Sequence, residues 1–250
     1  NTWADRYTDR QITGTTQTVF NGLKLAKEVT YKKDTVELYD ASFRIQKVDG
    51  QVQKTVDYPV YFRNVAKDKL PEEGSKVSLW ATNLSQSINP GWVIILTPLV
   101  VAFFTFLRSR KKEPSTPTKI AFGLLISALS VLVMIAAVNM GANGSEKVSV
   151  WWLVANYGVI TIGELFLSPM GLSVVSKLSP TNITSLMMGG WFLATSIGNK
   201  LSGVLASLWD TYDNKQDFFW INFGLLMFAT MLMFILLKQL NKVMQEKGIH

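Results

Sequence analysis

The chain has 250 residues, of which 48% are hydrophobic and 17% charged, and its formal net charge at pH 7 is +7. It contains no cysteine and a single histidine, His250, which excludes disulfides, thiolate metal sites, Ser-His-Asp catalysis and histidine-based metal sites. The basic excess lies in loops beside apolar runs and no RNA- or DNA-binding motif accompanies it, so we expect no nucleic-acid partner.

Polar and apolar residues are divided unevenly along the chain. Apolar runs of membrane-spanning length recur from about Ile88 onward, whereas residues 1–87 hold most of the acids and no such run. This pattern predicts an integral membrane protein with an attached polar region.

Residues 1–20 are interpreted as the end of a preceding span and an outer loop. The first residue is Asn rather than Met, and no basic segment followed by a short apolar segment opens the chain. Because the polar region is placed outside the membrane by the loop charges described below, at least one upstream span is expected, and the chain would be a piece of a longer one. A cleaved signal peptide is the alternative.

Residues 21–87 are predicted to form a small β-rich extracytoplasmic insertion. Apolar residues lie on both sides of Asp49-Gly50, a pair typical of a hairpin turn that needs positive φ. They are Phe43, Ile45 and Val48 before the pair and Val52 and Val56 after it.

Two further features complete this region. Val60, Phe62 and Val65 are predicted to add an edge strand that starts at Pro59, and residues 69–74 to form a turn leading back to the membrane. We expect a structural or accessory role for the insertion, with a partner-binding module as the alternative.

Five apolar segments are predicted to be transmembrane helices, because each has about the 20 residues needed to cross a hydrocarbon core of roughly 30 Å. They are residues 88–107, 120–138, 150–170, 183–208 and 218–237. Since the backbone must satisfy its own hydrogen bonds inside a bilayer, helix is the structure open to such segments. Residues 88–250 are therefore predicted to form a transmembrane bundle with a polar tail, and the fold class to be an all-α polytopic membrane protein.

The Lys and Arg residues of the loops predict the orientation. Nine lie in the loops after the first and third spans and in the tail, against two in the other two loops. Because basic residues concentrate in cytoplasmic loops, the C-terminus is predicted to be cytoplasmic and residues 1–87 to lie outside a cell (inner) membrane.

Glu164 lies near the middle of the third predicted span. A charged side chain within a span is costly unless it faces a cavity or a partner, so such residues are candidates for function. A carboxyl group in a cavity of low dielectric can exchange a proton at moderate pH and attract an ammonium group. We interpret Glu164 as a substrate anchor, a proton site or both; a carboxyl that only ties helices together is the alternative.

Lys200, in the outer part of the fourth span, is the second charged residue within a span. It is interpreted as a gating or structural residue that either snorkels to the interface or pairs with Glu164. Pro169 removes a backbone donor, so a kink is predicted there, with Ser168 bonding the freed carbonyl. The kinked helix is a candidate gate, with a static kink as the alternative.

Two more residues have both a functional and a packing interpretation. Asn89 precedes Pro90 at the start of the first span, where a capping role competes with a binding role. Trp191 lies among small residues of the fourth span and either lines a cavity or packs between helices.

Four stretches of the chain carry a family resemblance. They are residues 1–10, residues 86–90, residues 163–173 with 177–180, and residues 187–195 with 198–199. In this order they resemble the proton-coupled oligopeptide transporter (POT/PTR) family of the major facilitator superfamily, and the Glu-x-x-x-Ser-Pro-x-Gly-Leu-Ser pattern that begins at Glu164 is the most specific. By this resemblance the five spans are similar to helices eight to twelve of a twelve-helix transporter, and residues 1–10 to the outer end of helix seven.

The resemblance implies the C-terminal part of a proton-coupled symporter that takes up di- and tripeptides by alternating access. It implies no enzymatic activity and no cofactor, with the proton as coupling ion. Glu164 would bind the amino terminus of the peptide, Asn89 would help to hold the same end, and Trp191 and Thr195 would line the pocket. The helices that contain Glu164 and Trp191 would form part of the inner gate. The implied partners are di- and tripeptides, the lipid bilayer and the missing N-terminal half.

The chain departs from the family pattern in two ways. It has no match to the family's Glu-x-x-Glu-Arg motif, and its insertion is long for the family. Two alternative functions are a membrane-anchored extracytoplasmic binding or assembly module and a major facilitator carrier for a non-peptide substrate. An intramembrane enzyme that uses Glu164 is disfavoured, because no second carboxylate, nucleophile or metal-ligand set converges in the spans.

Overall fold

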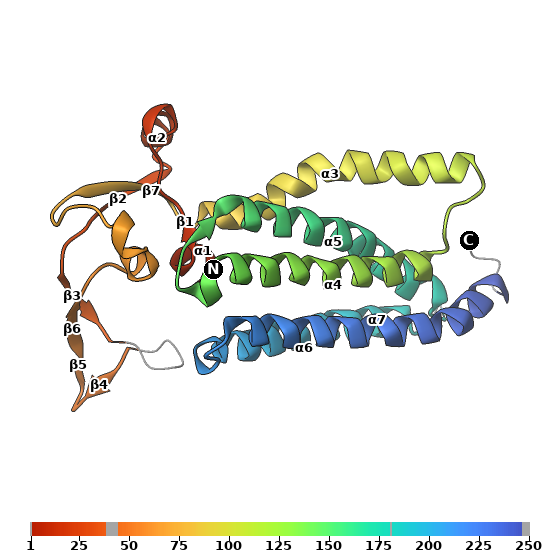
Figure 1. The fold of residues 1–250 in the computed structure, drawn as a ribbon. Coiled ribbons are helices and arrows are strands. Elements are labelled where there is room, and N and C mark those ends of the chain that lie inside the picture. The colour runs from red at the N-terminus through yellow and green to blue at the C-terminus, as the bar shows by residue number, and fades with distance from the viewer. Residues whose placement is uncertain (1, 39–44, 181, 247–250) are drawn as a thin grey trace. The chain divides into compact units, whose positions relative to one another are not determined.

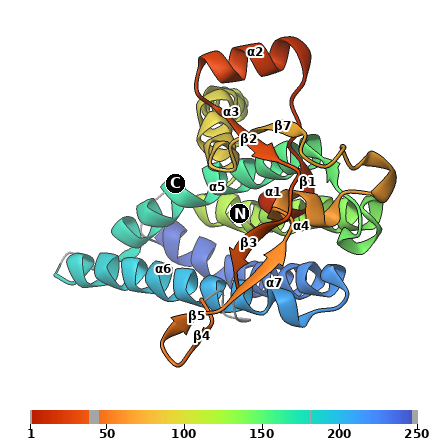
Figure 2. The ribbon, with the colours of Figure 1, turned by 90° about the vertical axis from the view of Figure 1, so that its left-hand side faces the viewer.

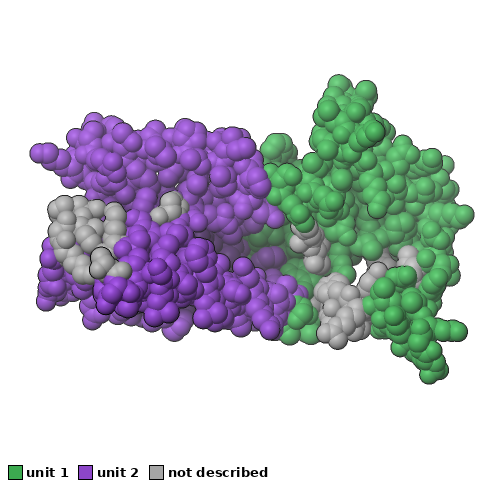
Figure 3. Space-filling view, turned by 180° about the vertical axis from the view of Figure 1, so that it is seen from behind, with its two compact units in different colours: residues 1–88, 134–154, 207–217 green, residues 89–133, 155–206, 218–250 purple. Residues whose placement is uncertain are grey.

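The structure of the protein is a computed structural model that describes residues 2–38, 45–180 and 182–246. The chain forms two compact units (Figure 3). Unit 1 contains residues 1–88, 134–154 and 207–217, and unit 2 contains residues 89–133, 155–206 and 218–250.

Five long helices follow the first strands in the chain (Figure 1). They are α3 (Leu84–Ser109), α4 (Thr116–Met140), α5 (Val150–Leu178), α6 (Thr184–Ser207) and α7 (Lys215–Glu246). All five predicted helical segments are confirmed. Four of them extend beyond the predicted ends, because polar residues continue the helix after the apolar run has stopped.

Four helices are long and apolar enough to cross a membrane: α3, α4, α5 as far as Ser176, and α7. The fifth, α6, has 24 residues, but Gly, Ser, Thr and Asn interrupt its apolar side chains. The prediction of an all-α polytopic bundle is confirmed, while the division of the chain into insertion and bundle at residue 87 stays a prediction.

Two glycines bring α4 and α5 together within unit 2. A Cβ atom on Gly123 would lie 2.9 Å from the backbone oxygen of Gly163, and one on Gly163 would lie 2.8 Å from the backbone oxygen of Gly123. Contacts this short leave no room for a side chain, so the two helices pack backbone to backbone. This packing holds the middle of α5, where Glu164 lies.

The surfaces of α6 and α7 are largely apolar and uncovered. The described part of α6 has no buried residue, and only Thr230 and Met244 are buried in α7. Phe192 and Phe228 are among their exposed large side chains. Such faces are available to lipid or to further protein.

Unit 1 contains short strands in two-stranded pieces. β1 (Thr8–Asp9) pairs in parallel with β8 (Val148–Ser149). Three antiparallel pairs join β2 (Ala26–Thr30) to β7 (Lys76–Trp80), β3 (Asp34–Glu37) to β6 (Lys54–Asp57), and β4 (Lys47–Val48) to β5 (Gln51–Val52). The β4–β5 hairpin continues the β3–β6 ribbon (Figure 2).

Unit 1 also contains short helices. They are α1 (Thr2–Arg6), α2 (Gly14–Gly22) and the 3₁₀ turns η1 (Val60–Asn64), η2 (Lys67–Lys69), η3 (Ala142–Gly144) and η4 (Trp209–Thr211). Trp3 of α1 stacks on Tyr7 at 4.9 Å between ring centroids and meets Trp209 of η4 edge-on at 6.1 Å. These rings tie α1 to the segment between α6 and α7 within unit 1.

The predicted hairpin at Asp49-Gly50 is confirmed. Both residues have positive φ, 51° and 77°, as the twist of a two-residue hairpin turn requires. Val48 pairs with Gln51 across the turn. Val56 lies in the next strand, β6, and Phe43 lies outside the described residues.

The predicted edge strand at residues 60–65 is wrong. Residues 60–64 form η1, with Pro59 directly before it. Tyr61 and Phe62 are both buried against Val77 and Leu79. Adjacent side chains point to opposite faces of a strand, so only a helical turn lets both aromatic rings enter one core. The turn at residues 69–74 does occur, but it leads into strand β7 before the membrane helix.

Candidate functional site

Asn89 and Glu164 are in contact between α3 and α5. The side-chain amide of Asn89 donates a hydrogen bond from Nδ2 to Oε2 of Glu164 at 3.1 Å. Glu164 is exposed on the surface of unit 2 and Asn89 is half-buried. Two residues that the sequence placed at the same end of a substrate therefore lie at one point of the bundle.

A third polar residue, which the sequence analysis missed, completes this contact. Thr161 is fully buried one turn before Glu164, and its hydroxyl lies 2.8 Å from Oδ1 of Asn89. The same hydroxyl lies 2.6 Å from the backbone oxygen of Tyr157. The sequence holds one sign of this contact. Thr161 lies three residues before Glu164, and residues three apart share one face of a helix.

The alternative role of Asn89 as a helix cap is wrong. α3 begins at Leu84, so Asn89 and Pro90 lie within the helix rather than at its start. Pro90 has no N–H to donate to the carbonyl of Gln86, which leaves that carbonyl without its helical partner. The Asn89 side chain is thus available for contact with α5.

Trp191 packs against α5 at a glycine. A Cβ atom on Gly171 would overlap the Trp191 indole, so the ring occupies the space that this glycine leaves. Gly171 lies two turns beyond Glu164, about 10 Å along the helix. Thr195, one turn further along α6, is exposed, and its hydroxyl donates to the backbone oxygen of Trp191 at 3.0 Å.

Three residues were predicted to have gating or structural roles: Lys200, Ser168 and Pro169. Lys200 is exposed, and within the described parts of the chain it forms no ion pair with Glu164. Ser168 is also exposed. Helix α5 continues through residue 169, and the kink at Pro169 stays a prediction.

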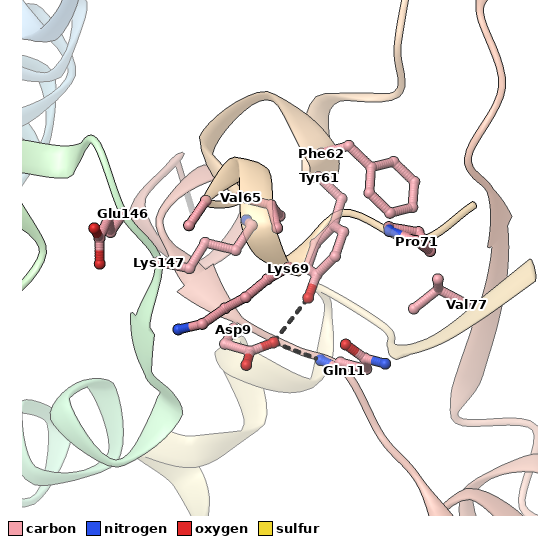
Figure 4. Close-up of a pocket in the computed structure, with 11 residues that line it drawn as sticks. Asp9, Gln11, Tyr61, Phe62, Val65, Lys69, Pro71, Val77, Glu146 and Lys147 are labelled. Carbon is pink, nitrogen blue, oxygen red and sulfur yellow. Dashed lines mark hydrogen bonds between the residues drawn. The ribbon is translucent and has the colours of Figure 1, made fainter. Parts of the chain in front are cut away.

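A charged cluster surrounds a cavity of about 120 Å³ in unit 1 (Figure 4). The ammonium group of Lys147 donates to the backbone oxygen of Arg6 at 2.9 Å and lies 4.1 Å from the centroid of the Tyr61 ring. The Tyr61 hydroxyl in turn donates to Asp9 at 2.7 Å. Burial lowers the pKa of Lys147 to about 8.

Arg10 of the same unit is buried, with 6% of its surface exposed. Its guanidinium donates to Asp5 at 2.7 Å and to the Thr82 hydroxyl at 2.8 Å. Burial lowers the pKa of Arg10, and the Asp5 carboxylate opposes that shift. No role was predicted for these charges, although residues 5–10, beside Trp3 and Tyr7, hold several of them.

A second charged cluster connects α3 to α4 in unit 2. Glu113 accepts hydrogen bonds from Arg108 at 2.7 Å and from Lys119 at 2.5 Å. These two cations lower the pKa of Glu113 to about 2. The cluster borders a cavity of about 880 Å³. Across residues 2–38, 45–180 and 182–246, no group of three His, Cys, Asp or Glu residues could hold a metal ion.

Comparison with known proteins identifies the family. The model of the POT family matches residues 81–221, more than half of the chain. Dipeptide and tripeptide permease A of Proteus mirabilis is 36% identical over 132 residues, which cover 53% of this chain and 26% of that protein. Dipeptide and tripeptide permease B of Xenorhabdus bovienii is 30% identical over 172 residues, covering 65% of this chain and 35% of that protein.

Solved structures agree with this assignment. A POT family transporter in complex with a thioalcohol-conjugated peptide has a TM-score of 0.58 and 25% identity, with 72% of this chain and 36% of that chain covered. Another, in complex with 5-aminolevulinic acid, has a TM-score of 0.57 and 26% identity, with 68% and 34% covered. The chain spans about a quarter to a third of the length of these relatives. It is a membrane protein that belongs to the POT family of transporters.

Proposed function

We propose that the chain is the C-terminal part of a proton-coupled symporter that takes up di- and tripeptides by alternating access. The contact of Asn89 with Glu164 is the observation that carries the proposal. The C-terminus lies in the cytoplasm of this transporter, as the basic loops indicate. A missing N-terminal half supplies the other wall of the binding site.

Glu164 anchors the amino terminus of the peptide. Asn89 holds Oε2 of the carboxylate, and Oε1 has no hydrogen-bond partner among the described residues. A peptide ammonium group carries three N–H donors and one positive charge, so it forms a charge-assisted hydrogen bond with an ionised carboxylate. Asn89 keeps the carboxylate in one orientation while the peptide binds.

Trp191 and Thr195 form the wall beside this anchor on α6. The half-buried indole of Trp191 provides a rigid apolar surface, and the exposed Thr195 hydroxyl lies one turn away on the same helix. The two residues suit a substrate whose side chains vary, because an indole face contacts apolar groups without requiring one shape. Lys200, Ser168 and Pro169 belong to the moving parts of the helices rather than to the anchor.

Peptide uptake by the intact transporter tests the anchor. Glu164→Gln should raise KM for dipeptides with a free amino terminus by about 30-fold, since a charged hydrogen bond contributes roughly 1.5–3 kcal/mol. It should leave weak binding of N-acetylated dipeptides unchanged. Glu72→Gln, at an exposed acid of the outer region, is the matched control. Unchanged affinity for free-amine peptides in Glu164→Gln would reject the anchor.

A carrier of another small amine is the second candidate, because one similar transporter was solved with 5-aminolevulinic acid. That molecule also has an amino group at one end. Competition separates the two functions, because a peptide carrier is inhibited by di- and tripeptides at lower concentrations than by the amine. Deletion of residues 21–80 tests the rival binding-module function, since a transporter should keep substantial uptake without them.

A further inference from the structure

The hydroxyl of Thr161 has two acceptors within reach and only one proton. It lies 2.8 Å from Oδ1 of Asn89 and 2.6 Å from the backbone oxygen of Tyr157. A threonine hydroxyl donates one hydrogen bond and accepts up to two. Thr161 can therefore either donate to Asn89 or donate to Tyr157 and accept from Asn89.

The Asn89 amide is also two-sided. One end faces Thr161 and the other faces Glu164 at 3.1 Å. A carboxamide carries an acceptor oxygen and a donor nitrogen of nearly equal size, and a turn of 180° about its last bond exchanges them. The groups on both sides of Asn89 thus determine whether Oδ1 or Nδ2 of the amide faces Thr161.

We propose that Thr161 and Asn89 form a hydrogen-bond relay that satisfies Glu164 in both its ionised and its protonated form. With Glu164 ionised, Asn89 donates to the carboxylate and accepts from Thr161. With Glu164 protonated, the carboxyl donates to Oδ1 of the turned amide, Nδ2 donates to Thr161, and the Thr161 hydroxyl donates to Tyr157. The inference deepens the proposed function, since it rests on Glu164 exchanging a proton during transport.

With Glu164 protonated, one proton lies between each facing pair of polar atoms. With Glu164 ionised, the Thr161 hydroxyl gives its proton to Asn89, and the backbone oxygen of Tyr157 keeps the helical hydrogen bond from the Thr161 N–H. Thr161 is fully buried, and a buried amide or hydroxyl atom left unpaired is costly. Because both states avoid that cost, Glu164 gains or loses its proton with only rotations of one amide and one hydroxyl. Thr161 is thus a positioning residue that acts on the carboxyl group through Asn89.

Few other ionisable groups bear on this site. Tyr157, on the same helix, interacts electrostatically with Glu164. The helices packed against α5 contribute Arg108 of α3, Lys119 of α4 and Lys200 of α6. The first two are bound to Glu113, and Lys200 forms no ion pair in the described residues. Among the described residues, the contact that Glu164 makes with a neighbouring helix is therefore its hydrogen bond with Asn89.

Two substitutions at Thr161 separate the relay from simple packing. Thr161→Val keeps the shape and removes the hydroxyl, whereas Thr161→Ser keeps the hydroxyl and loses a methyl group. In the intact transporter, the relay predicts that Val raises KM for dipeptides about tenfold and that Ser stays within about twofold of wild type. If Thr161 only packs between the helices, Thr161→Ser should raise KM more than Thr161→Val does. That result would overturn the proposal.

A spectroscopic measurement needs neither transport nor a Thr161 variant. Infrared difference spectra of the transporter with ¹³C-labelled Asn are recorded against pH in nanodiscs. The Asn89 amide band, assigned by its loss in Asn89→Leu, should shift at the same pH midpoint as the Glu164 carboxyl band appears, and it should not shift in Glu164→Gln. A carboxyl band that appears while the Asn89 band stays constant would overturn the relay.

The two proposals fail in distinguishable ways. If Glu164→Gln leaves peptide affinity unchanged while the Asn89 and Glu164 bands shift together, the peptide-anchor function is wrong and the relay stands. If Glu164→Gln abolishes the affinity while the Asn89 band does not follow pH, the anchor stands and the relay is wrong.

Discussion

The ammonium group of Lys147 lies over the ring of Tyr61, 4.1 Å from its centroid, although 86 residues separate the two in the sequence. Lys147 precedes β8 and Tyr61 belongs to η1, so one contact joins the loop between α4 and α5 to the polar region. The same ammonium group is bonded to Arg6 of α1. A single cation thereby links three distant segments of unit 1.

The stability of unit 1 should rise with pH in an alkaline window. Burial lowers the pKa of Lys147 from 10.5 to about 8, so the unfolded chain binds more protons than the folded one between these values. The free energy of unfolding should therefore increase from about pH 8 to about pH 10.5. Thermal unfolding followed by tryptophan fluorescence measures this slope, which should become smaller in Lys147→Met. Lys54→Met, at an exposed lysine of β6, should keep the wild-type slope.

Acid should weaken the connection between α3 and α4. Arg108 and Lys119 hold the pKa of Glu113 at about 2, below its ordinary 4.5, so the stabilisation is present above pH 4.5 and is lost as the pH falls towards 2. Glu113→Gln should lower the unfolding temperature at pH 7 and flatten its dependence on pH in that window. Glu246→Gln, at an exposed acid near the end of α7, should change neither. An unaltered acid profile in Glu113→Gln would contradict this role.

The backbone contact of α4 with α5 should not tolerate a methyl group. Gly163→Ala places a Cβ atom within 2.8 Å of the Gly123 backbone oxygen and should cost about 1–3 kcal/mol through overpacking. Gly224→Ala in α7 has no atom within 4 Å of its new Cβ and should be neutral or slightly stabilising, because alanine is the better helix former. Denaturant unfolding in micelles compares the two. Equal stability of both variants would show that the helices separate easily.

Substitution of Gly171 by alanine should displace the Trp191 indole from α5. Gly171→Ala puts a Cβ atom where the indole lies, so the ring moves away from α5. If Trp191 lines the peptide pocket as proposed, KM should rise about tenfold in this variant. Adding Trp191→Phe to Gly171→Ala should recover part of the affinity, because the smaller ring leaves room for the new methyl group. Gly190→Ala, with open space around its Cβ, is the control.

The length of the apolar runs predicted the helices well, because helix is the structure in which a continuous apolar segment can satisfy its backbone hydrogen bonds inside a bilayer. It could not predict their ends. Leu84–Ser87 is polar enough to resemble a loop, yet it forms the first turn of α3 and carries Asn89 into the helix. The resemblance implied that Asn89 and Glu164 hold the same end of a peptide, whereas the local rules for helix starts favoured a cap for Asn89.

The charged clusters depend on contacts that no local pattern contains. The distance from Lys147 to Tyr61 and from Asp5 to Thr82 is set by the tertiary structure of unit 1. Thr161 was missed for a related reason. Its spacing places it on the face of Glu164, but a threonine on an apolar helix resembles any packing residue until its partner on α3 is known. The 3₁₀ turn at Tyr61 and Phe62 was missed because alternating apolar residues also suit a strand.

Helix α5 begins at Val150, the residue that follows β8, and β8 is bound to β1 through its main chain. The segment that carries Glu164 is therefore covalently continuous with a strand tethered to the beginning of the chain. A force applied to Thr8 and Asp9 would therefore reach the first residues of α5 through the main-chain hydrogen bonds between β1 and β8.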